Sequence, residues 1–153
     1  MRILLVEDNP VDADLLHEIL ADDASTTFQI THVERLKVAL DAIVHDNFDM
    51  ALLDLSLPDS QGLETVAQLR QFAPTLPIVV LTGLDDEQIA LQTVSNGAQD
   101  YLVKGTITTE MLVRVIRYAI ERGRILKQLQ DSEQQTLKAL AKERELHQLK
   151  SQF

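Results

Sequence analysis

The chain has 153 residues, of which 45% are hydrophobic and 25% are charged, and its formal net charge at pH 7 is −10. This length accommodates one globular domain with a short appendage, and the hydrophobic fraction is ordinary for a packed core. The negative charge argues against nucleic acid as a partner because phosphates are repelled, and the absence of cysteine excludes disulfides and zinc–thiolate sites. No apolar run approaches the ~20 residues of a membrane span, so we expect no membrane segment in this chain and a cytoplasmic location.

Charge is distributed unevenly along the sequence. Residues 1–122 carry 8 basic and 20 acidic side chains, a net of −12, whereas residues 123–153 carry 6 basic and 4 acidic side chains, a net of +2. We therefore predict an acidic globular domain over residues 1–123 and a helical extension over residues 124–153.

Five short aliphatic runs indicate strands, at residues 3–6, 28–33, 50–53, 78–81 and 101–103. Most of these runs are continuously apolar, as strands covered on both faces are, whereas residues 28–33 alternate and predict an edge strand. Asn9 and Pro10 predict the start of the first helix, and Pro74 and Pro77 end the third. The helical segments between the strands have apolar stripes at Leu15, Leu16, Ile19 and Leu20, at Leu36, Leu40 and Ile43, and at Leu63, Val66 and Leu69. This alternation predicts an α/β fold with a doubly wound, five-stranded parallel sheet.

The fifth predicted helix begins near Thr108, and no stop signal follows it. At about 100° per residue, one apolar stripe runs along it, made of Leu112, Val115, Ala119, Leu126, Leu129, Leu137 and Leu140. The spacing of its leucines repeats after 11 residues, which is compatible with a straight or slightly right-handed coil. A single exposed helix with incidental leucines is the alternative. Because that helix would leave the stripe in water, we predict a homodimer that pairs through this helix as a coiled coil.

Polar side chains stand where the predicted strands end, at Glu7, Asp8, Asp54, Thr82 and Lys104. Ligands of doubly wound sheets bind at this edge, so these side chains converge on one crevice. Three carboxylates in one place repel one another unless a divalent cation such as Mg²⁺ or Mn²⁺ neutralises them. Lys104 and Thr82 supply the charge and the hydrogen bond that suit a phosphoryl group. The pattern thus predicts a carboxylate nucleophile that forms an aspartyl phosphate.

Four segments carry a resemblance to a known family: ILLVEDNPVDADLL, MALLDLSLPDSQGLE, IVVLTGLDD and GAQDYLVKG. Over residues 1–123 the chain resembles the response-regulator receiver domain of two-component signalling. The resemblance implies a flavodoxin-like sheet with strand order 2-1-3-4-5. It also implies a regulatory phosphoacceptor that is not an enzyme, apart from its own phosphorylation and dephosphorylation.

The resemblance also implies roles for individual residues. Asp54 would be the phosphoacceptor, and a histidine kinase or a phosphotransfer protein would be the donor. The implied ligands of the metal are Glu7, Asp8, Asp54 and the main-chain carbonyl of Ser56. The implied phosphate-binding and switch residues are Thr82, Lys104 and Tyr101, although an ordinary strand aromatic is the alternative for Tyr101. Phosphorylation would then change how two protomers pair and send the signal through the C-terminal helix.

One departure from the family pattern and two tuning positions concern the loops around the crevice. Receivers usually follow the lysine with a cis proline, whereas Lys104 precedes Gly105, so the loop either keeps a cis bond at glycine or takes a trans path. Ser56 and Leu84 stand where receivers tune hydrolysis of the phosphoryl group. Because a bulky Leu84 would hinder the attacking water, we hypothesise slow self-dephosphorylation.

Other functions remain open at this point. One is a pseudo-receiver scaffold that only dimerises, and another is an aspartyl-phosphate phosphatase resembling haloacid dehalogenases, which usually have a second Asp where this chain has Ser56. A flavodoxin-like FMN site is disfavoured because Glu7 and Asp8 repel a phosphate. The C-terminal segment has no helix-turn-helix and no strongly basic stretch, so a DNA-binding effector is not expected there.

The last nine residues, ELHQLKSQF, carry a second resemblance. They are similar to the residues that precede the phospho-accepting histidine in the dimerisation helix of sensor kinases. None of the chain's four histidines stands in that motif, and generic coiled-coil sequence is the alternative. The resemblance would make the chain a piece of a larger kinase or a stand-alone relative of one.

Overall fold

The structure is a computed structural model that describes residues 1–22 and 27–152, without the side chains of residues 151 and 152. Contacts within the chain divide it into two units, Met1–Gly123 and Arg124–Phe153, which we call the globular unit and the tail. Each is described by itself.

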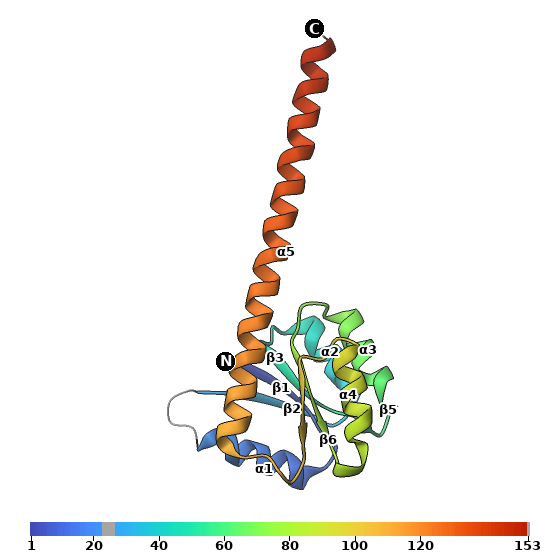
Figure 1. Ribbon diagram of the computed structural model, residues 1–153, viewed down its shortest axis with the longest axis vertical. Helices are drawn as coiled ribbons and strands as arrows, with labels where there is room; N and C mark the ends of the chain where they lie inside the picture. Colours follow the sequence, from blue (N-terminus) through green and yellow to red (C-terminus); the bar gives the residue numbers. More distant parts are fainter. Residues whose placement is uncertain (23–26, 153) are drawn as a thin grey trace. The chain divides into compact units, whose positions relative to one another are not determined.

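The globular unit is built on a five-stranded sheet in which all neighbouring strands are parallel. Its strands are β1 (Arg2–Val6), β2 (Gln29–Val33), β3 (Met50–Asp54), β6 (Ile78–Thr82) and β7 (Asp100–Val103). Their order is β2-β1-β3-β6-β7, which confirms the predicted doubly wound, flavodoxin-like order and the edge position of the second strand (Figure 1).

Helices cover both faces of the sheet (Figure 1). They are α1 (Pro10–Ala21), α2 (Leu36–His45), α3 (Leu63–Phe72), α4 (Glu87–Ser95) and α5 (Thr109–Gln152), and a short 3₁₀ turn spans Leu84–Asp86. One face packs against α1 and the first turns of α5, where Leu52 lies in a core with Leu16 and Ile116. The other face packs against α2 and α3, where Leu53 lies with Ala39 and Val66. Successive strand residues thus enter opposite cores, which explains why the central runs are apolar throughout.

Two of the predicted helical stripes each contain one exposed leucine. Leu16 and Leu20 of α1 are buried as predicted, but Leu15 is 50% exposed. Leu63 at the start of α3 is also exposed, whereas Val66 and Leu69 are buried. A helix turns by about 100° per residue, so Leu15 cannot share the sheet-facing side with its neighbour Leu16. The prediction was therefore wrong for these two side chains.

A small hairpin that the sequence did not predict follows β3. It consists of β4 (Ser56–Leu57) and β5 (Ser60–Gln61), which pair antiparallel. Its turn residue Asp59 caps α2, because its two carboxylate oxygens accept the N–H groups of Leu36 at 2.9 Å and Lys37 at 3.0 Å. The helix has no capping side chain of its own, so the hairpin supplies the cap and is held in place by it.

Helix α5 belongs to both units. Within the globular unit it buries Leu112, Ile116 and Ala119, and it passes so close to Pro77 that a Cβ at Gly123 would lie 2.3 Å from the proline Cγ. A glycine inside a helix costs up to about 1 kcal/mol relative to alanine. This close approach to Pro77 gives the physical reason for a glycine there.

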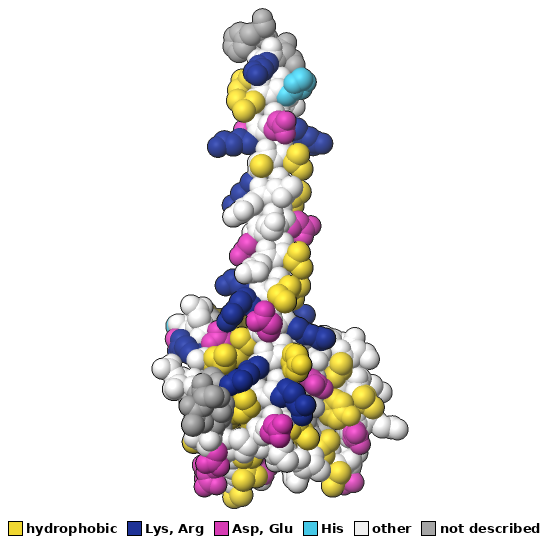
Figure 2. Space-filling view, turned by 60° about the vertical axis from the view of Figure 1, so that its left-hand side comes forward, with side chains coloured by type: hydrophobic (Ala, Val, Ile, Leu, Met, Phe, Trp, Pro, Cys, Tyr) yellow, Lys and Arg dark blue, Asp and Glu magenta, His cyan; other side chains and the backbone are white. Residues whose placement is uncertain are grey.

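The tail is helical from Arg124 to Gln152, so the predicted extension has no internal break. Its apolar side chains lie uncovered among charged ones (Figure 2). The exposed leucines, between 52% and 63% accessible, are Leu129, Leu137, Leu140, Leu146 and Leu149. Neither α5 nor any other described helix combines the length and apolar character of a membrane-spanning segment.

Candidate functional site

A cavity of about 570 Å³ opens at the carboxyl ends of β1, β3 and β6. Six residues singled out from the sequence line it: Glu7, Asp8, Asp54, Ser56, Thr82 and Lys104. Each follows or ends a strand of the parallel sheet, so the topology that orders the strands also gathers these side chains.

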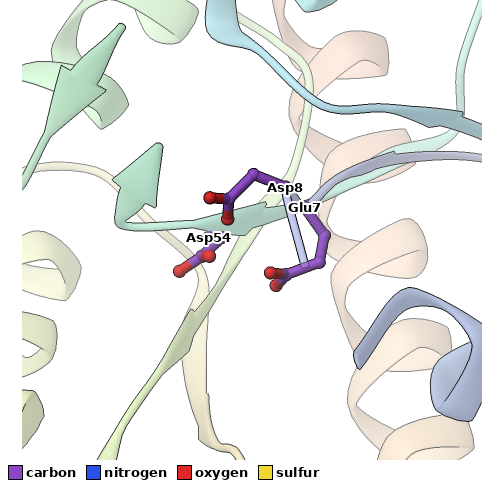
Figure 3. Close-up of side chains that lie close together, drawn as sticks. All are labelled: Glu7, Asp8 and Asp54. Atoms are coloured by element: carbon purple, nitrogen blue, oxygen red, sulfur yellow. The ribbon is translucent and has the colours of Figure 1, made fainter. Parts of the chain in front are cut away.

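Three carboxylates form an acidic trio in this cavity. Glu7 and Asp8 follow β1 and Asp54 ends β3, and each offers one oxygen such that the three lie within 4.8 Å of one another (Figure 3). Glu7 and Asp54 are buried, whereas Asp8 is exposed. A set of hard oxygen donors open to solvent on one side suits Mg²⁺ or Mn²⁺, which keep some of their waters.

Glu7 is the most constrained member of the trio. Its main-chain carbonyl accepts a hydrogen bond from His32 Nε2 at 2.7 Å, and its Oε1 accepts one from the Asn9 N–H at 3.1 Å. Its buried Oε2 forms an ion pair with the ammonium of Lys104 at 2.8 Å and has no further partner among the described residues. Burial, together with the charge of Asp54, raises the pKa of Glu7 to about 7 against the lowering effect of Lys104. A buried carboxylate oxygen that is balanced by an ammonium is one that a divalent cation can also ligate, and with the two neighbouring carboxylates it makes the trio fit a divalent metal.

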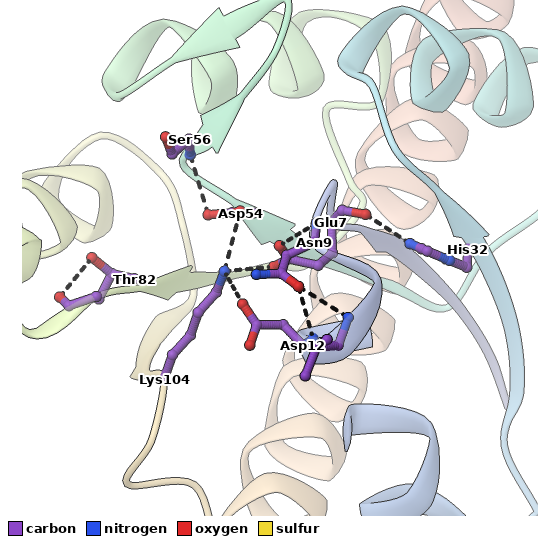
Figure 4. Close-up of polar contacts among 10 residues, drawn as sticks. Glu7, Asn9, Asp12, His32, Asp54, Ser56, Thr82 and Lys104 are labelled. Carbon is purple, nitrogen blue, oxygen red and sulfur yellow. Dashed lines mark hydrogen bonds and ion pairs between the residues drawn. The ribbon is translucent and has the colours of Figure 1, made fainter. Parts of the chain in front are cut away.

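Lys104 is the counter-ion of the cavity. Its Nζ lies 2.8 Å from Glu7 Oε2, 3.1 Å from Asp12 Oδ2 and 3.2 Å from Asp54 Oδ2 (Figure 4). Burial alone lowers the pKa of a lysine, but the hydrogen bond to Glu7 and the charge of Asp54 outweigh burial and hold the pKa of Lys104 above its usual value. The ammonium therefore stays charged at physiological pH.

Asp54 and Thr82 face the cavity from neighbouring strands. Asp54 Oδ1 accepts the Ser56 N–H at 3.1 Å and its Oδ2 accepts a hydrogen bond from Lys104, so both oxygens are oriented (Figure 4). Thr82 is buried at the end of β6, and its Oγ1 donates to the Gly83 carbonyl at 3.3 Å. Thr82 thus lines the cavity with its hydroxyl bonded to the neighbouring carbonyl.

Tyr101 lies outside the residues that line the cavity. It is partly buried on β7, and its hydroxyl donates to Glu87 Oε1 at 3.0 Å, at the start of α4. This hydrogen bond, with a smaller effect of burial, raises the pKa of the Tyr101 phenol. The structure thus brings six of the seven singled-out residues together and holds the tyrosine beside α4.

The loop after Lys104 follows a trans path. The described peptide bonds include no cis bond, and Gly105 has φ +90°. Glycine adopts this region without steric cost. Of the two paths left open by the sequence, the structure thus has the trans one, and Gly105 makes the turn through its positive φ.

Several residues that contact the site were not singled out from the sequence, and two of them form hydrogen bonds with its central groups. His32 reaches the Glu7 carbonyl from β2, and Asp12 reaches Lys104 from the first turn of α1. An acidic residue in a first helical turn is common because it complements the helix dipole, so Asp12 carried no distinctive signal. The position of Asp12, three residues after the N-cap Asn9, places it near the carboxyl end of β1 and was the one sequence feature that indicated closeness to the site.

Comparison with known proteins identifies the family. The profile of the response regulator receiver domain matches residues 3–117. The chain belongs to the response regulator receiver family. The resemblance drawn from the sequence motifs is thereby confirmed, and with it the assignment to the regulatory phosphoacceptor domains of two-component signal transduction.

Individual relatives extend the comparison. This receiver is 31% identical over 111 residues to the glycerol metabolism activator of Pseudomonas putida, covering 72% of this chain and 50% of that protein. It is 31% identical over 135 residues to the transcriptional regulatory protein KdpE of Staphylococcus aureus, covering 88% of this chain and 53% of that protein. The crystal structure of NtrX from Brucella abortus superposes with a TM-score of 0.74 at 26% identity, covering 85% of this chain and 29% of that one. The chain spans about half the length of the curated relatives it matches.

Proposed function

We propose that this receiver accepts a phosphoryl group on Asp54 from a phosphohistidine of a histidine kinase or of a phosphotransfer protein. The observation that carries the proposal is the position of the Asp54 carboxylate, which is buried at a strand end, oriented by Ser56 and paired with Lys104 at 3.2 Å. A carboxylate oxygen of Asp54 attacks phosphorus, the new O–P bond forms and the N–P bond of the donor breaks. The donor imidazole leaves with the electron pair of that bond.

A divalent cation, Mg²⁺ or Mn²⁺, would be held by Glu7, Asp8, Asp54 and the main-chain carbonyl of Ser56. Support comes from the spacing of the three carboxylates and from the buried Glu7 Oε2, whose one partner among the described residues is the Lys104 ammonium. When bound, such an ion neutralises the carboxylates and the charge of the transferred group. Lys104 adds a charge-assisted hydrogen bond to a phosphoryl oxygen, which it can do because its ammonium is already beside Asp54.

Thr82 and Tyr101 form the proposed switch. The Thr82 hydroxyl, now bonded only to a neighbouring carbonyl, would move to the phosphoryl oxygens, and Tyr101 would leave Glu87 and rotate into the space vacated. The hydrogen bond of Tyr101 to Glu87 ties this rotation to the start of α4. The surface formed by α4, β7 and α5 would change as a result.

We further propose that residues 1–123 are the receiver proper and that residues 124–153 pair as a coiled coil with a second copy of the chain. The exposed leucines of the tail support the pairing, because about 25 cal/mol is gained for each Å² of apolar surface removed from water. Helix α5 contributes both to the core of the globular unit and to the tail, so it is the element through which the phosphorylated state would reach the pairing helices.

The acceptor role is tested by incubating the chain with Mg²⁺ and acetyl phosphate and measuring its intact mass, with Asp54→Asn as the matched variant. We expect the gain of one phosphoryl group in the wild type and none in Asp54→Asn. A wild type that gains nothing would leave the dimerisation scaffold as the better function. Release of phosphate over many turnovers would favour the phosphatase.

The role of the tail is tested by disulfide cross-linking of single cysteines introduced at exposed tail positions, which are the only thiols because the chain has none of its own. We expect cross-linking between two copies, with a pattern along residues 126–149 that changes when beryllofluoride mimics the phosphoryl group. An identical pattern with and without the mimic would contradict the relay, and no cross-linking at any position would contradict the pairing.

A further inference from the structure

Two carboxylates besides the acidic trio line the cavity, Asp12 and Asp86, and that of Asp12 is bonded to the lysine. Its Oδ2 accepts a hydrogen bond from Lys104 Nζ at 3.1 Å (Figure 4). Among the described residues, the carboxylates close enough to share a cation are those of the acidic trio, and Asp12 is not one of them. Asp12 therefore acts on the counter-ion of the site.

The backbone fixes the position of Asp12. The residue lies in the first turn of α1, where Pro10 starts the helix and the Asn9 side chain accepts the Asp12 N–H at 3.4 Å. Its side chain is 32% exposed, against 0% for Glu7 and 7% for Asp54. Of the three carboxylates beside the lysine, Asp12 is thus the one most open to solvent.

Of the three carboxylates that contact the lysine, two would also be ligands of a bound cation. An ammonium has three N–H donors, and Lys104 lies within 3.2 Å of three carboxylates. Two of these, Glu7 and Asp54, also belong to the acidic trio. A cation on the trio would compete with Lys104 for their oxygens, and Asp12 is the partner that this competition leaves to the lysine.

We propose that Asp12 is a positioning residue that holds the Lys104 ammonium toward the solvent side of the cavity, so that the oxygens of Glu7 and Asp54 stay available to a divalent cation. The inference rests on the proposed function and adds to it a residue for which the family motifs gave no role. Without the Asp12 charge, Lys104 is held by Glu7 and Asp54 alone, and a cation has to displace it from both.

Cation binding and phosphorylation should therefore respond differently to Asp12→Asn. The affinity for Mg²⁺ falls, because the cavity loses a negative charge and the lysine competes more strongly for the trio. Raising Mg²⁺ to saturation overcomes this competition, so the rate at which acetyl phosphate phosphorylates Asp12→Asn returns toward that of the wild type. A purely structural role of Asp12 would lower both quantities together.

Calorimetric titration of the full chain with Mg²⁺ alone tests the inference. Asp14→Asn is the matched control, because Asp14 lies on the same helix, is exposed and makes the same change of charge. We expect Asp12→Asn to raise the dissociation constant for Mg²⁺ about fivefold, Asp14→Asn to raise it less than about twofold, and Asp12→Glu, which keeps the charge, to stay close to the wild type.

Nitrogen NMR of the Lys104 ammonium gives a second readout that does not depend on phosphorylation. Its signal, assigned by its loss in Lys104→Arg, should shift in Asp12→Asn and stay unchanged in Asp14→Asn. Equal Mg²⁺ affinities for the two Asn variants, or a loss of phosphorylation in Asp12→Asn at saturating Mg²⁺, would overturn the inference. If the wild type binds Mg²⁺ but is not phosphorylated, the proposed acceptor function fails, and the titration still decides the role of Asp12. If the wild type does not bind Mg²⁺, the inference about Asp12 fails with it.

Discussion

Most leucine side chains are buried in the globular unit and exposed in the tail. Leu52, in the middle of β3, is 0% exposed, whereas Leu137, in the tail, is 59% exposed. In the globular unit, strands and helices from distant parts of the chain cover one another on both faces of the sheet. The tail is one helix, and a helix cannot cover its own apolar stripe. Most apolar side chains of the globular unit are therefore buried against other elements of the same unit. The apolar stripe of the tail can be buried only by contact with something other than its own helix.

The largest expected effect tests this contrast directly. Leu52→Ala should lower the free energy of unfolding by about 2–5 kcal/mol, because it leaves a cavity between the sheet and α1. Leu137→Ala, the same change in the tail, should alter the unfolding of the monomer by less than about 0.5 kcal/mol. Urea unfolding of dilute protein, followed by circular dichroism, measures both values. Similar losses for the two variants would show that the tail leucine is already covered within the monomer.

The second prediction concerns Glu7, a carboxylate that is fully buried in the globular unit. Its pKa is raised from 4.5 to about 7 on folding, chiefly because burial disfavours the charged form. The native state therefore binds more protons than the unfolded state between these values, so the contribution of Glu7 to stability is fully present below about pH 4.5 and is lost as the pH rises through about 7. Without divalent cations, the stability of the wild type relative to Glu7→Gln should fall by ~2 kcal/mol across this window. A constant difference from acid to neutral pH would contradict the raised pKa.

The smallest expected effect is at the hairpin after β3. Slight burial raises the pKa of Asp59, but the N–H groups of Lys37 and Leu36 outweigh it, so the pKa lies below its ordinary value. Asp59→Ala should cost about 1 kcal/mol at neutral pH, as the loss of a helix cap usually does. Because the pKa is lowered in the folded state, this difference should be present above about pH 4 and shrink as the pH falls through the folded pKa. Thermal unfolding at several pH values measures it, and a difference that persists in acid would argue against a cap by the ionised carboxylate.

Much of the fold could be predicted because its causes are local. Continuous apolar runs gave the central strands, alternation gave the edge strand at Gln29–Val33, and the Asn9–Pro10 start of α1 appears in the structure as predicted. The order of the strands depends on contacts between distant segments, and it was supplied by the family resemblance. The exposure of Leu15 was missed because an apolar residue on a helix indicates burial only if its exact angle faces the sheet.

The residues of the site likewise fall into those that the sequence could place and those that depend on contacts between distant segments. Glu7, Asp54 and Lys104 could be placed together because each follows a parallel strand, and parallel strands end at one edge. Asp12 could not, because its role depends on the distance from the first turn of α1 to a lysine 92 residues away in sequence. The path of Gly105 was open for a similar reason, since it is set by a backbone angle that the sequence permits but does not impose.

The central claim, that Asp54 accepts the phosphoryl group, is tested most directly by chemical trapping. Borohydride reduces an aspartyl phosphate to homoserine, so phosphorylated protein can be reduced, digested and mapped by mass spectrometry. The account predicts homoserine at position 54 and unmodified carboxylates at Glu7, Asp8 and Asp12. Homoserine at another position, or none in protein that has gained a phosphoryl group, would contradict it.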